Sequence, residues 1–212
     1  MTKPMGLLAV GFDYSGSSED EFNDWYDTEH IPQRLRVKGF VNAERWVGAD
    51  DPKISLVTYD LASPGVLQSA SYLAIAGANL SPWSRRVAAK CRRIGRFVAE
   101  QIVPGSQAAP QNAGGLLFVG MNVEPRAEDE FNDWYDTEHL PRLMAVPGCL
   151  CARRFRAAGG SHKYIAIYHL ESAEVCASRT WKDAVATPWT AKIIPHTSVH
   201  LRIPVRRYTR RV

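Results

Sequence analysis

Two histidines of this chain lie in the same chemical setting. Each directly follows a glutamate and lies four residues after a tyrosine. The two groups are Tyr26, Glu29 and His30, and Tyr135, Glu138 and His139. Residues four apart share one face of a helix, so each histidine can contact its tyrosine. Histidine gains and loses a proton near neutral pH. Oriented by a carboxylate beside a phenol, it can remove or deliver a proton on an enclosed substrate.

Four more side chains are candidates for contact with a substrate. They are Trp25, Trp134, Arg45 and Arg154. A guanidinium group can hold a carboxylate or enolate oxygen with two N–H groups, so the arginines suit an acidic substrate.

The same residues also fit a purely structural role. Phe22, Trp25 and Tyr26 have the spacing of an apolar stripe that seats a helix on a sheet. In that interpretation Glu29 and His30 hydrogen-bond to nearby backbone. The two arginines then pair with helix carboxylates and never meet a ligand.

Both groups belong to a repeated segment. The twelve residues EDEFNDWYDTEH occur at 19–30 and again at 128–139, an offset of 109 residues. Matches continue at this offset beyond the segment, as Tyr59 and Tyr168 show. The surroundings have diverged, whereas solvent-type positions inside the segment, such as Asn23, are unchanged. This retention favours a function, and a recent local gene conversion also explains it.

Each half of the chain predicts the same order of elements. Apolar stretches predict strands at 7–14, 40–47, 54–61 and 92–103, and again at 116–123, 149–156, 164–170 and 197–207. A helix begins at residue 19, and Pro32 predicts its end or a kink near His30. Serine–proline signals at 63–64 and 81–82 predict a second helix and a short extra helix. The order is β-α-β-β-α-β, the ferredoxin-like unit.

The predicted fold class is therefore α+β, with two tandem ferredoxin-like repeats. A unit of this kind carries helices on one sheet face only, so its other face has to be covered. Two antiparallel sheets packed face to face within one chain satisfy this requirement. The predicted organisation is a first half at 1–103, a linker at 104–115 and a second half at 116–212.

The pattern W-Y-x-x-E-H-x-P, followed by V-x-G and an arginine on the next strand, resembles the EthD-like branch of the dimeric α/β-barrel superfamily. The resemblance covers both halves and implies a fused pair that mimics the usual dimer. It also implies a small organic molecule enclosed between sheet and helices. Relatives include decarboxylases, dehydratases, lactone isomerases, cofactor-free oxygenases and haem-binding proteins. The motif is thus specific for the fold and weak for the reaction.

The first strand of each half has two different faces. One face suits packing against helices and carries Leu8, Val10 and Phe12, with Leu117, Val119 and Met121 in the second half. The other face carries small residues that lead to Asp13 in the first half and Asn122 in the second. Small residues before a polar one predict a lumen with room for a ligand, and make Asp13 and Asn122 substrate-binding candidates.

Composition and motifs exclude several other functions. The net charge of +4 is accounted for by four arginines near the C-terminus, which are Arg206, Arg207, Arg210 and Arg211. They predict a solvated tail, not the basic face of a nucleic-acid binder. No apolar run reaches the length of a membrane span. The four cysteines show no spacing typical of a disulfide framework, and the sequence begins without a recognisable signal peptide. Both features favour the cytoplasm. No repeated set of ligands predicts a metal or another cofactor.

The leading hypothesis is a cofactor-independent lyase or isomerase that acts on an enclosed organic substrate by acid–base chemistry. A non-catalytic ligand-binding protein is the alternative, and a cofactor-free oxygenase or haem-binding protein is a further one. Assembly of the fused pair into a homo-oligomer stays open. The two halves differ in charge around the histidines, since Asn122 takes the place of Asp13 and Leu143 takes the place of Arg34. We therefore expect His30 and His139 to differ in pKa and in their effect on ligand binding.

Overall fold

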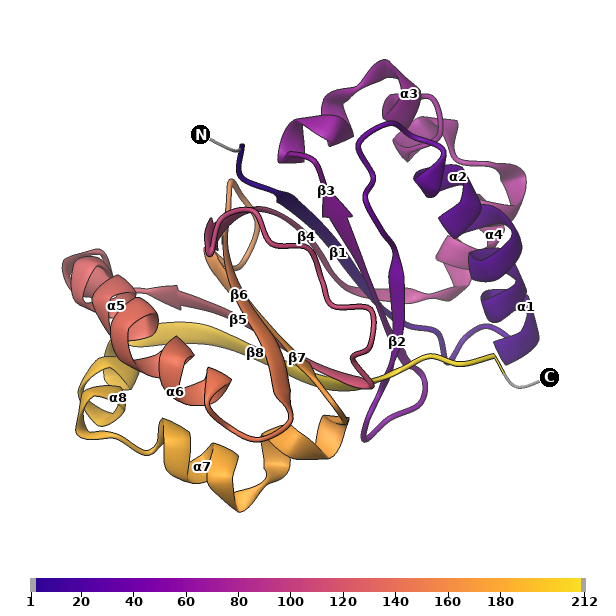
Figure 1. Cartoon of the computed structure of the whole chain (residues 1–212). Helices are drawn as coiled ribbons and strands as arrows, with labels where there is room; N and C mark the ends of the chain where they lie inside the picture. Colours follow the sequence, from indigo (N-terminus) through magenta and orange to yellow (C-terminus); the bar gives the residue numbers. More distant parts are fainter. Residues whose placement is uncertain (1–2, 211–212) are drawn as a thin grey trace.

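The computed structural model, which describes residues 3–210 apart from the side chain of Val199, is a closed antiparallel barrel with helices outside it (Figure 1). Around the barrel the strands follow the order β1-β3-β2-β8-β5-β7-β6-β4. The strands are β1 (Gly6–Asp13), β2 (Glu44–Gly48), β3 (Ile54–Leu61), β4 (Arg92–Val103), β5 (Gly115–Val123), β6 (Cys149–Ala157), β7 (Tyr164–Leu170) and β8 (Thr197–Arg207). The sequence predicts all of them, although β2 begins four residues later than expected.

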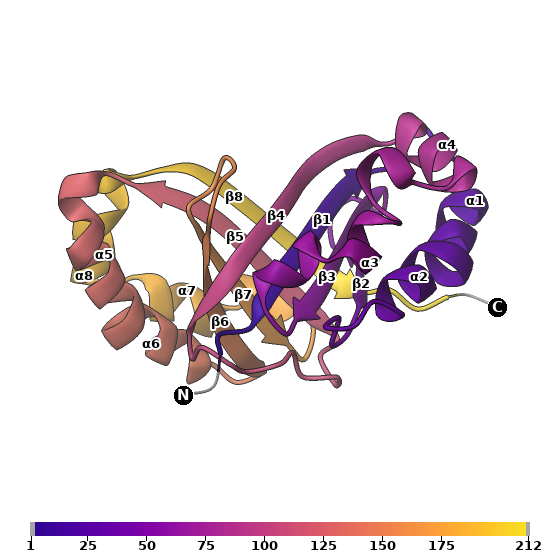
Figure 2. The same ribbon diagram turned by 90° about the horizontal axis from the view of Figure 1, so that it is seen from above.

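The helical segments of each half cover their own side of the barrel (Figure 2). The first half contains α1 (Glu19–Asp24), η1 (Trp25–His30), α2 (Ile31–Leu35), η2 (Pro64–Gln68), α3 (Ala70–Leu73), η3 (Gly77–Asn79) and α4 (Pro82–Lys90). The second contains η4 (Pro125–Ala127), α5 (Glu128–Trp134), η5 (Tyr135–His139), α6 (Leu140–Met144), η6 (Ala173–Ala177), α7 (Arg179–Val185), α8 (Pro188–Ile193) and η7 (Ile194–His196). Among the described residues, no helix combines the length and apolarity needed to span a membrane.

The barrel closes where strands of different halves pair. At one seam β2 pairs with β8, and Trp46 lies opposite Arg207. At the other seam β4 pairs with β6, and Gln101 lies opposite Phe155. The two predicted sheets therefore join edge to edge, which leaves neither with a free edge in the described chain. The predicted α+β class and the dimeric α/β-barrel architecture are confirmed.

Side chains fill the interior of the barrel. Leu7 and Ala9 of β1 belong to a fully buried cluster with Trp46 and Phe118. Leu8, on the opposite face of β1, packs beneath the helices of the first half. The two predicted faces of β1 are thus correct. The inner face, which was expected to border a roomy lumen, is instead packed with the buried side chains of the cluster that contains Leu7.

Two pairs of polar side chains lie inside the barrel, one an ion pair and one a contact between a histidine and a glutamate. Arg153 donates from Nη1 to Asp60 at 2.8 Å and to the Gln107 carbonyl at 3.0 Å, and the Arg153 and Asp60 side chains are fully buried. Nearby, His169 Nε2 lies 3.3 Å from Glu44 Oε2. Asp60 is on β3 and Arg153 on β6, which are not neighbouring strands. Their pairing therefore links the two halves across the interior.

The segment between β4 and β5 lies against one end of the barrel. The Gln101 side chain hydrogen-bonds to the backbone of Gln107 in both directions, and the Ala109 N–H donates to Asp60 at 2.7 Å. The Ala113 carbonyl accepts a hydrogen bond from Arg207 of β8. This segment, predicted as a linker, therefore supplies hydrogen-bond partners to the buried side chains of Gln101 and Asp60.

Replacement of Asp60 tests the cross-barrel pair. Asp60→Ala leaves the Arg153 guanidinium buried without its counter-charge, and we expect a loss of about 3–5 kcal/mol in the free energy of unfolding. Urea denaturation followed by circular dichroism measures this loss. Asp183→Ala, which breaks the exposed pair with Arg179, is the control and should cost less than about 0.5 kcal/mol. Equal losses in the two variants would contradict the role given to Asp60.

Candidate functional site

The helix that carries the repeated segment passes through a wide turn at the histidine. Ser18 caps its start by accepting from the Glu21 N–H. Across η1 the Ile31 N–H donates to the Tyr26 carbonyl, five residues back, and α2 then continues to Leu35. The helix therefore does not end near His30, and the irregularity expected there takes the form of a wide turn. The wider turn removes the clash that Pro32 would cause in a regular helix, so the helix runs on.

Each histidine packs between the aromatic side chains of its own segment. The His30 ring lies 4.4 Å from Trp25 and 5.3 Å from Tyr26, measured between centroids. His139 has the same neighbours at 4.3 and 5.0 Å. The structure thus brings the predicted tyrosine and histidine together in both halves. The Nδ1 atoms of both histidines are buried without a hydrogen-bond partner in the described structure.

The glutamates bind the neighbouring helix instead of orienting the histidines. Glu29 Oε1 accepts from Ser81 Oγ at 2.6 Å and from Ser84 Oγ at 3.0 Å, at the start of α4. Trp25 Nε1 donates to the same Ser84 Oγ at 2.9 Å. In the second half Glu138 accepts from Thr187 at 2.6 Å, at the start of α8. These contacts fix the first helix of each half to its short last helix.

The arginines on β2 and β6 hold the same helices to the sheet. Arg45 donates to Asp27 at 2.5 Å and to Asn23 at 2.6 Å, and its guanidinium lies 4.8 Å from the Tyr26 ring. Arg154 repeats this arrangement in the second half with Asp136 and Asn132. Both arginines therefore pair with side chains of the helix, as the structural interpretation expects, and neither lines the first-half cavity. These contacts also explain why the solvent-type positions of the segment are retained.

A cavity of about 380 Å³ lies in the first half, between the outer face of the sheet and the helices. Its apolar lining comes from the strand face that was predicted to pack against helices and from η2, α3 and the following loop. Those residues are Leu8, Val10, Phe12, Leu67, Leu73 and Leu80. Trp25 and His30 line it from η1. The position between sheet and helices is the one that the family resemblance implies for a bound molecule.

Two polar residues of this cavity were missed by the sequence reasoning. Arg34 is 4% exposed and Tyr59 is 1% exposed, and both line the cavity. Arg34 Nη1 and the Tyr59 hydroxyl are buried without a partner. Within residues 3–210, no carboxylate lies within ion-pair distance of Arg34. From the sequence, Arg34, one helical turn after His30, was expected only as a charge that lowers the pKa of His30, and the structure bears out that direction.

The corresponding space of the second half is filled. Leu143 stands at the position of Arg34 and Trp181 at that of Tyr72, and both belong to the buried core of that half. Leu143 is 1% exposed and Trp181 is 5% exposed. Identical motifs therefore support an open cavity in one half and a packed core in the other.

Both histidines are neutral at pH 7. Burial lowers the pKa of His30 well below its usual value of 6.5, and the Arg34 guanidinium lowers it further. Burial, followed by the charge of Arg154, lowers the pKa of His139 to about 4. Desolvation dominates in both because the charged imidazolium is disfavoured away from water. The expected influence of Asp13 on His30 is not among the causes.

Asp13 and Asn122 organise loops instead. Asp13 accepts from the backbone N–H and the hydroxyl of Ser15 and pairs with Arg92 at 3.0 Å. These hydrogen bonds lower the pKa of Asp13 to about 2. Asn122 bonds to the backbone of Ser161 and Lys163. Neither Asp13 nor Asn122 lines the first-half cavity.

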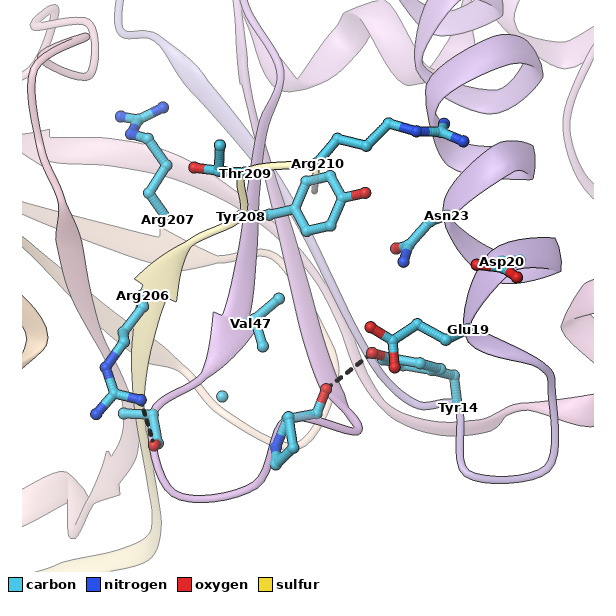
Figure 3. Close-up of a pocket in the computed structure, with 13 residues that line it drawn as sticks. Tyr14, Glu19, Asp20, Asn23, Val47, Arg206, Arg207, Tyr208, Thr209 and Arg210 are labelled. Carbon is cyan, nitrogen blue, oxygen red and sulfur yellow. Dashed lines mark hydrogen bonds between the residues drawn. The ribbon is translucent and has the colours of Figure 1, made fainter. Parts of the chain in front are cut away.

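The described part of the C-terminal tail is docked on the first helix, contrary to the expected solvated end. The Arg45 guanidinium lies 3.7 Å from the centroid of the Tyr208 ring. Arg210 donates to Asp24 and to Asp27. Figure 3 shows Tyr208 and Arg210 reaching from the end of β8 toward α1, along an open groove of about 770 Å³. Arg211, predicted as part of the same tail, lies outside the described residues.

Among residues 3–210, no group of three or more histidine, cysteine, aspartate or glutamate side chains could hold a metal ion.

No protein-family model matches the sequence, and a search of curated proteins gives no significant match. Solved structures do match. An anthrone oxidase-like protein has a TM-score of 0.63 with 13% identity, over 97% of this chain and 95% of its own. A haem-binding protein from Thermus thermophilus has a TM-score of 0.61 with 10% identity, over 98% and 92%. A variant of chlorite dismutase from Candidatus Nitrospira defluvii has a TM-score of 0.59 with 9% identity, over 99% and 93%. At such identities the similarity establishes the dimeric α/β-barrel fold alone.

The low pKa of His139 predicts a pH dependence of stability. The unfolded chain binds this proton near pH 6.5 and the folded chain only near pH 4, so stability is fully present above pH 6.5 and is lost as the pH falls toward 4. His139→Phe should remove up to about 3 kcal/mol of that loss. Urea denaturation at pH 7 and pH 4.5 measures it. The exposed His200→Gln variant is the control and should lose as much as the unmodified protein; an equal loss in His139→Phe would refute the assignment.

Removal of the tail contacts should loosen the first half alone. In the double variant Tyr208→Ala/Arg210→Ala, Arg45 loses its outer ring contact, and α1 and η1 each lose one ion pair with Arg210. We expect a small fall in the free energy of unfolding, because the Arg210 pairs are exposed to water and the Tyr208 ring contact contributes most. Hydrogen–deuterium exchange should become faster at 19–35 and stay unchanged at 128–144. Faster exchange in both segments would show that the tail stabilises the whole barrel.

Proposed function

We propose that the first-half cavity binds a planar, mainly apolar organic molecule with an ionisable oxygen or an acidic C–H group, and acts on it as an enzyme. The observation that carries this proposal is Arg34, a buried cation that faces the cavity and has no carboxylate partner in the described chain. A buried charge of this kind is costly unless it is paired. An anion formed on a bound substrate would supply the missing counter-charge.

His30 is the proposed base. It is neutral at pH 7, lines the cavity and lies one helical turn before Arg34. Removal of a proton from the substrate gives an imidazolium and an enolate or phenolate. The Arg34 guanidinium then stabilises the new oxyanion in an environment with little water, where such attraction is strong. Tyr59 offers a further hydroxyl donor to that oxygen.

Oxidation by dioxygen is the proposed fate of this anion. The anthrone oxidase-like neighbour supports it, and anthrone is a suitable test substrate. His30 takes a proton from the methylene carbon, and the electron pair moves to the carbonyl oxygen beside Arg34. Dioxygen accepts electrons from the enolate and bonds to the former methylene carbon. The proton held by His30 then returns to the peroxide oxygen to give a hydroperoxide. Loss of water from the hydroperoxide leaves the quinone. The balance is C14H10O + O2 → C14H8O2 + H2O.

Two other fates of the bound molecule stay as alternatives. Return of the proton to a different carbon, or loss of a leaving group, gives the isomerase or lyase reaction. A non-catalytic binding role is favoured by the low pKa of His30, because a weakly basic imidazole removes protons slowly.

Haem does not fit the residues of this cavity. A histidine that ligates a metal usually donates its other ring N–H to a carboxylate or carbonyl, whereas His30 Nδ1 has no partner in the described structure. The cavity of about 380 Å³ is also near the lower end of the range for ligand sites. No step of the proposed reaction therefore passes through a haem.

We also propose that the chain arose by fusion of two EthD-like copies and acts in the cytoplasm. The twelve-residue identity and the same element order in both halves support the fusion. The cysteines of the described chain are all free thiols, which suits a reducing compartment.

Turnover of anthrone tests the proposed function. Oxygen uptake and the absorbance of anthraquinone should depend on His30, and His30→Ala should lower kcat/KM by about 100-fold, the contribution of a general base. Arg34→Gln should cause a similar loss. The matched control is His139→Ala in the filled second half, which should stay within about twofold of the unmodified protein.

Three outcomes would contradict the proposal. Equal losses in His30→Ala and His139→Ala would mean that the halves act as equals. Unchanged turnover in His30→Ala would remove the base. A stoichiometric Soret band after incubation with haemin, together with higher turnover, would replace the cofactor-independent reaction by a haem-dependent one.

A further inference from the structure

Two arginines of β4 lie at the first-half cavity on the side of the strands. Arg93 and Arg96 both line it and are exposed. In a regular strand, residues three apart face opposite sides of the sheet. The register of β4 against β1 shifts here, so that Phe12 pairs with Arg93 while Val10 pairs with Arg96. This bulge places both arginines on the strand face of Val10 and Phe12, which line the same cavity.

These two cations have no acidic partner in the described chain. No carboxylate within residues 3–210 lies within ion-pair distance of Arg93 or Arg96, whereas the adjacent Arg92 pairs with Asp13 at 3.0 Å. Arg93 contacts the Phe12 ring, with Cζ 6.0 Å from its centroid. An arginine that packs its aliphatic part on an apolar surface, and whose guanidinium has no carboxylate partner, is suited to bind an anionic ligand.

Tyr72 connects this pair to the deep arginine. Its hydroxyl accepts from Arg96 Nη2 at 3.3 Å, and its ring lies 5.7 Å from Arg34 Cζ. Arg34 and Arg96 therefore contact different parts of one tyrosine, and the apolar residues of the cavity surround them. The cavity thus offers two cationic positions, one buried at Arg34 and one exposed at Arg93 and Arg96.

The second half lacks this arrangement. Arg202, the counterpart of Arg96, donates to the Cys176 carbonyl at 3.1 Å. The sequence position of Arg93 is occupied by Val199. Where the inner space is filled, the pair of free arginines is also missing. The two cationic positions therefore occur together in the first half.

We propose that Arg93 and Arg96 form a second anion-binding position, and that the natural ligand is an elongated aromatic carboxylic acid. This inference rests on the proposed function, because it needs the ionisable end of the molecule to lie at Arg34 and His30. The carboxylate at the other end then lies at Arg93 and Arg96, at the exposed side of the cavity. Recognition at both ends fixes the orientation of the molecule and presents its acidic proton to His30.

The expected contribution of the outer position is moderate. Both arginines are exposed, so water and salt screen their charge. Charge-assisted hydrogen bonds at such a place are worth on the order of tenfold in affinity. The gain should decrease at high ionic strength, whereas the deep contact with Arg34 should be less sensitive.

Binding of two naphthols that differ in one group tests the inference. Isothermal titration calorimetry compares 2-naphthol with 6-hydroxy-2-naphthoate at low salt. The unmodified protein should bind the naphthoate about tenfold more tightly. Arg93→Gln/Arg96→Gln should abolish this preference and leave the affinity for 2-naphthol unchanged. Arg85→Gln, on the exposed face of α4, is the matched control and should keep the preference.

The results separate this inference from the proposed function. Equal affinity of the unmodified protein for both compounds, or a preference that survives in Arg93→Gln/Arg96→Gln, overturns the outer position while the deep site stands. Weaker binding of both compounds in Arg34→Gln supports the deep site independently. Failure of both compounds to bind the unmodified protein overturns the cavity as an aromatic site, and the outer position with it.

Discussion

Each four-stranded half of this protein carries helices on one face, so its other face and both of its edges have to be covered. The chain meets this constraint by pairing β2 with β8 and β4 with β6, which buries both inner faces in one interior. Because that interior is filled by side chains and by pairs such as Asp60 with Arg153, little room is left in it for a ligand. Space for one is found where the helices meet the outer face of the sheet, and the cavity of the first half lies there.

The repeated segment makes the same structural contacts in both halves but has different neighbours in each. Its tryptophan, asparagine, last aspartate and last glutamate fix the helix to the sheet and to the following helices in both halves, through contacts with partners such as Arg45 and Ser84. These shared contacts give four positions of the segment a structural role in both halves. The difference in chemistry comes from residues outside it. Arg34 leaves a charged, open cavity, whereas Leu143 and Trp181 complete an apolar core.

Local patterns predicted the elements well, because alternation and capping act over a few residues. The strands at Ile54–Leu61 and Arg92–Val103 were predicted at their observed bounds. The end of the first helix was not, because a wide turn accommodates Pro32 at a low cost that no residue pattern reveals. The contact between His30 and Tyr26 followed from helical spacing.

Other site residues depended on tertiary partners. Glu29 was expected near His30, but its partners lie on α4, more than 50 residues away. Arg34 was expected to act on the pKa of His30 but not to contact a ligand, because only the packed structure shows that it is buried and lines a cavity.

The seam between β2 and β8 has a consequence for the order of events during synthesis. It joins residues that are far apart along the chain, since Glu44 and Arg207 are separated by 163 positions. Closing so long a loop costs conformational entropy that only the finished contacts offset. The first half can assemble its own hairpins as it leaves the ribosome, but the edge of β2 stays unpaired until the last strand emerges. Throughout that interval the nascent chain presents an open edge, so this seam is where premature association with another chain would begin.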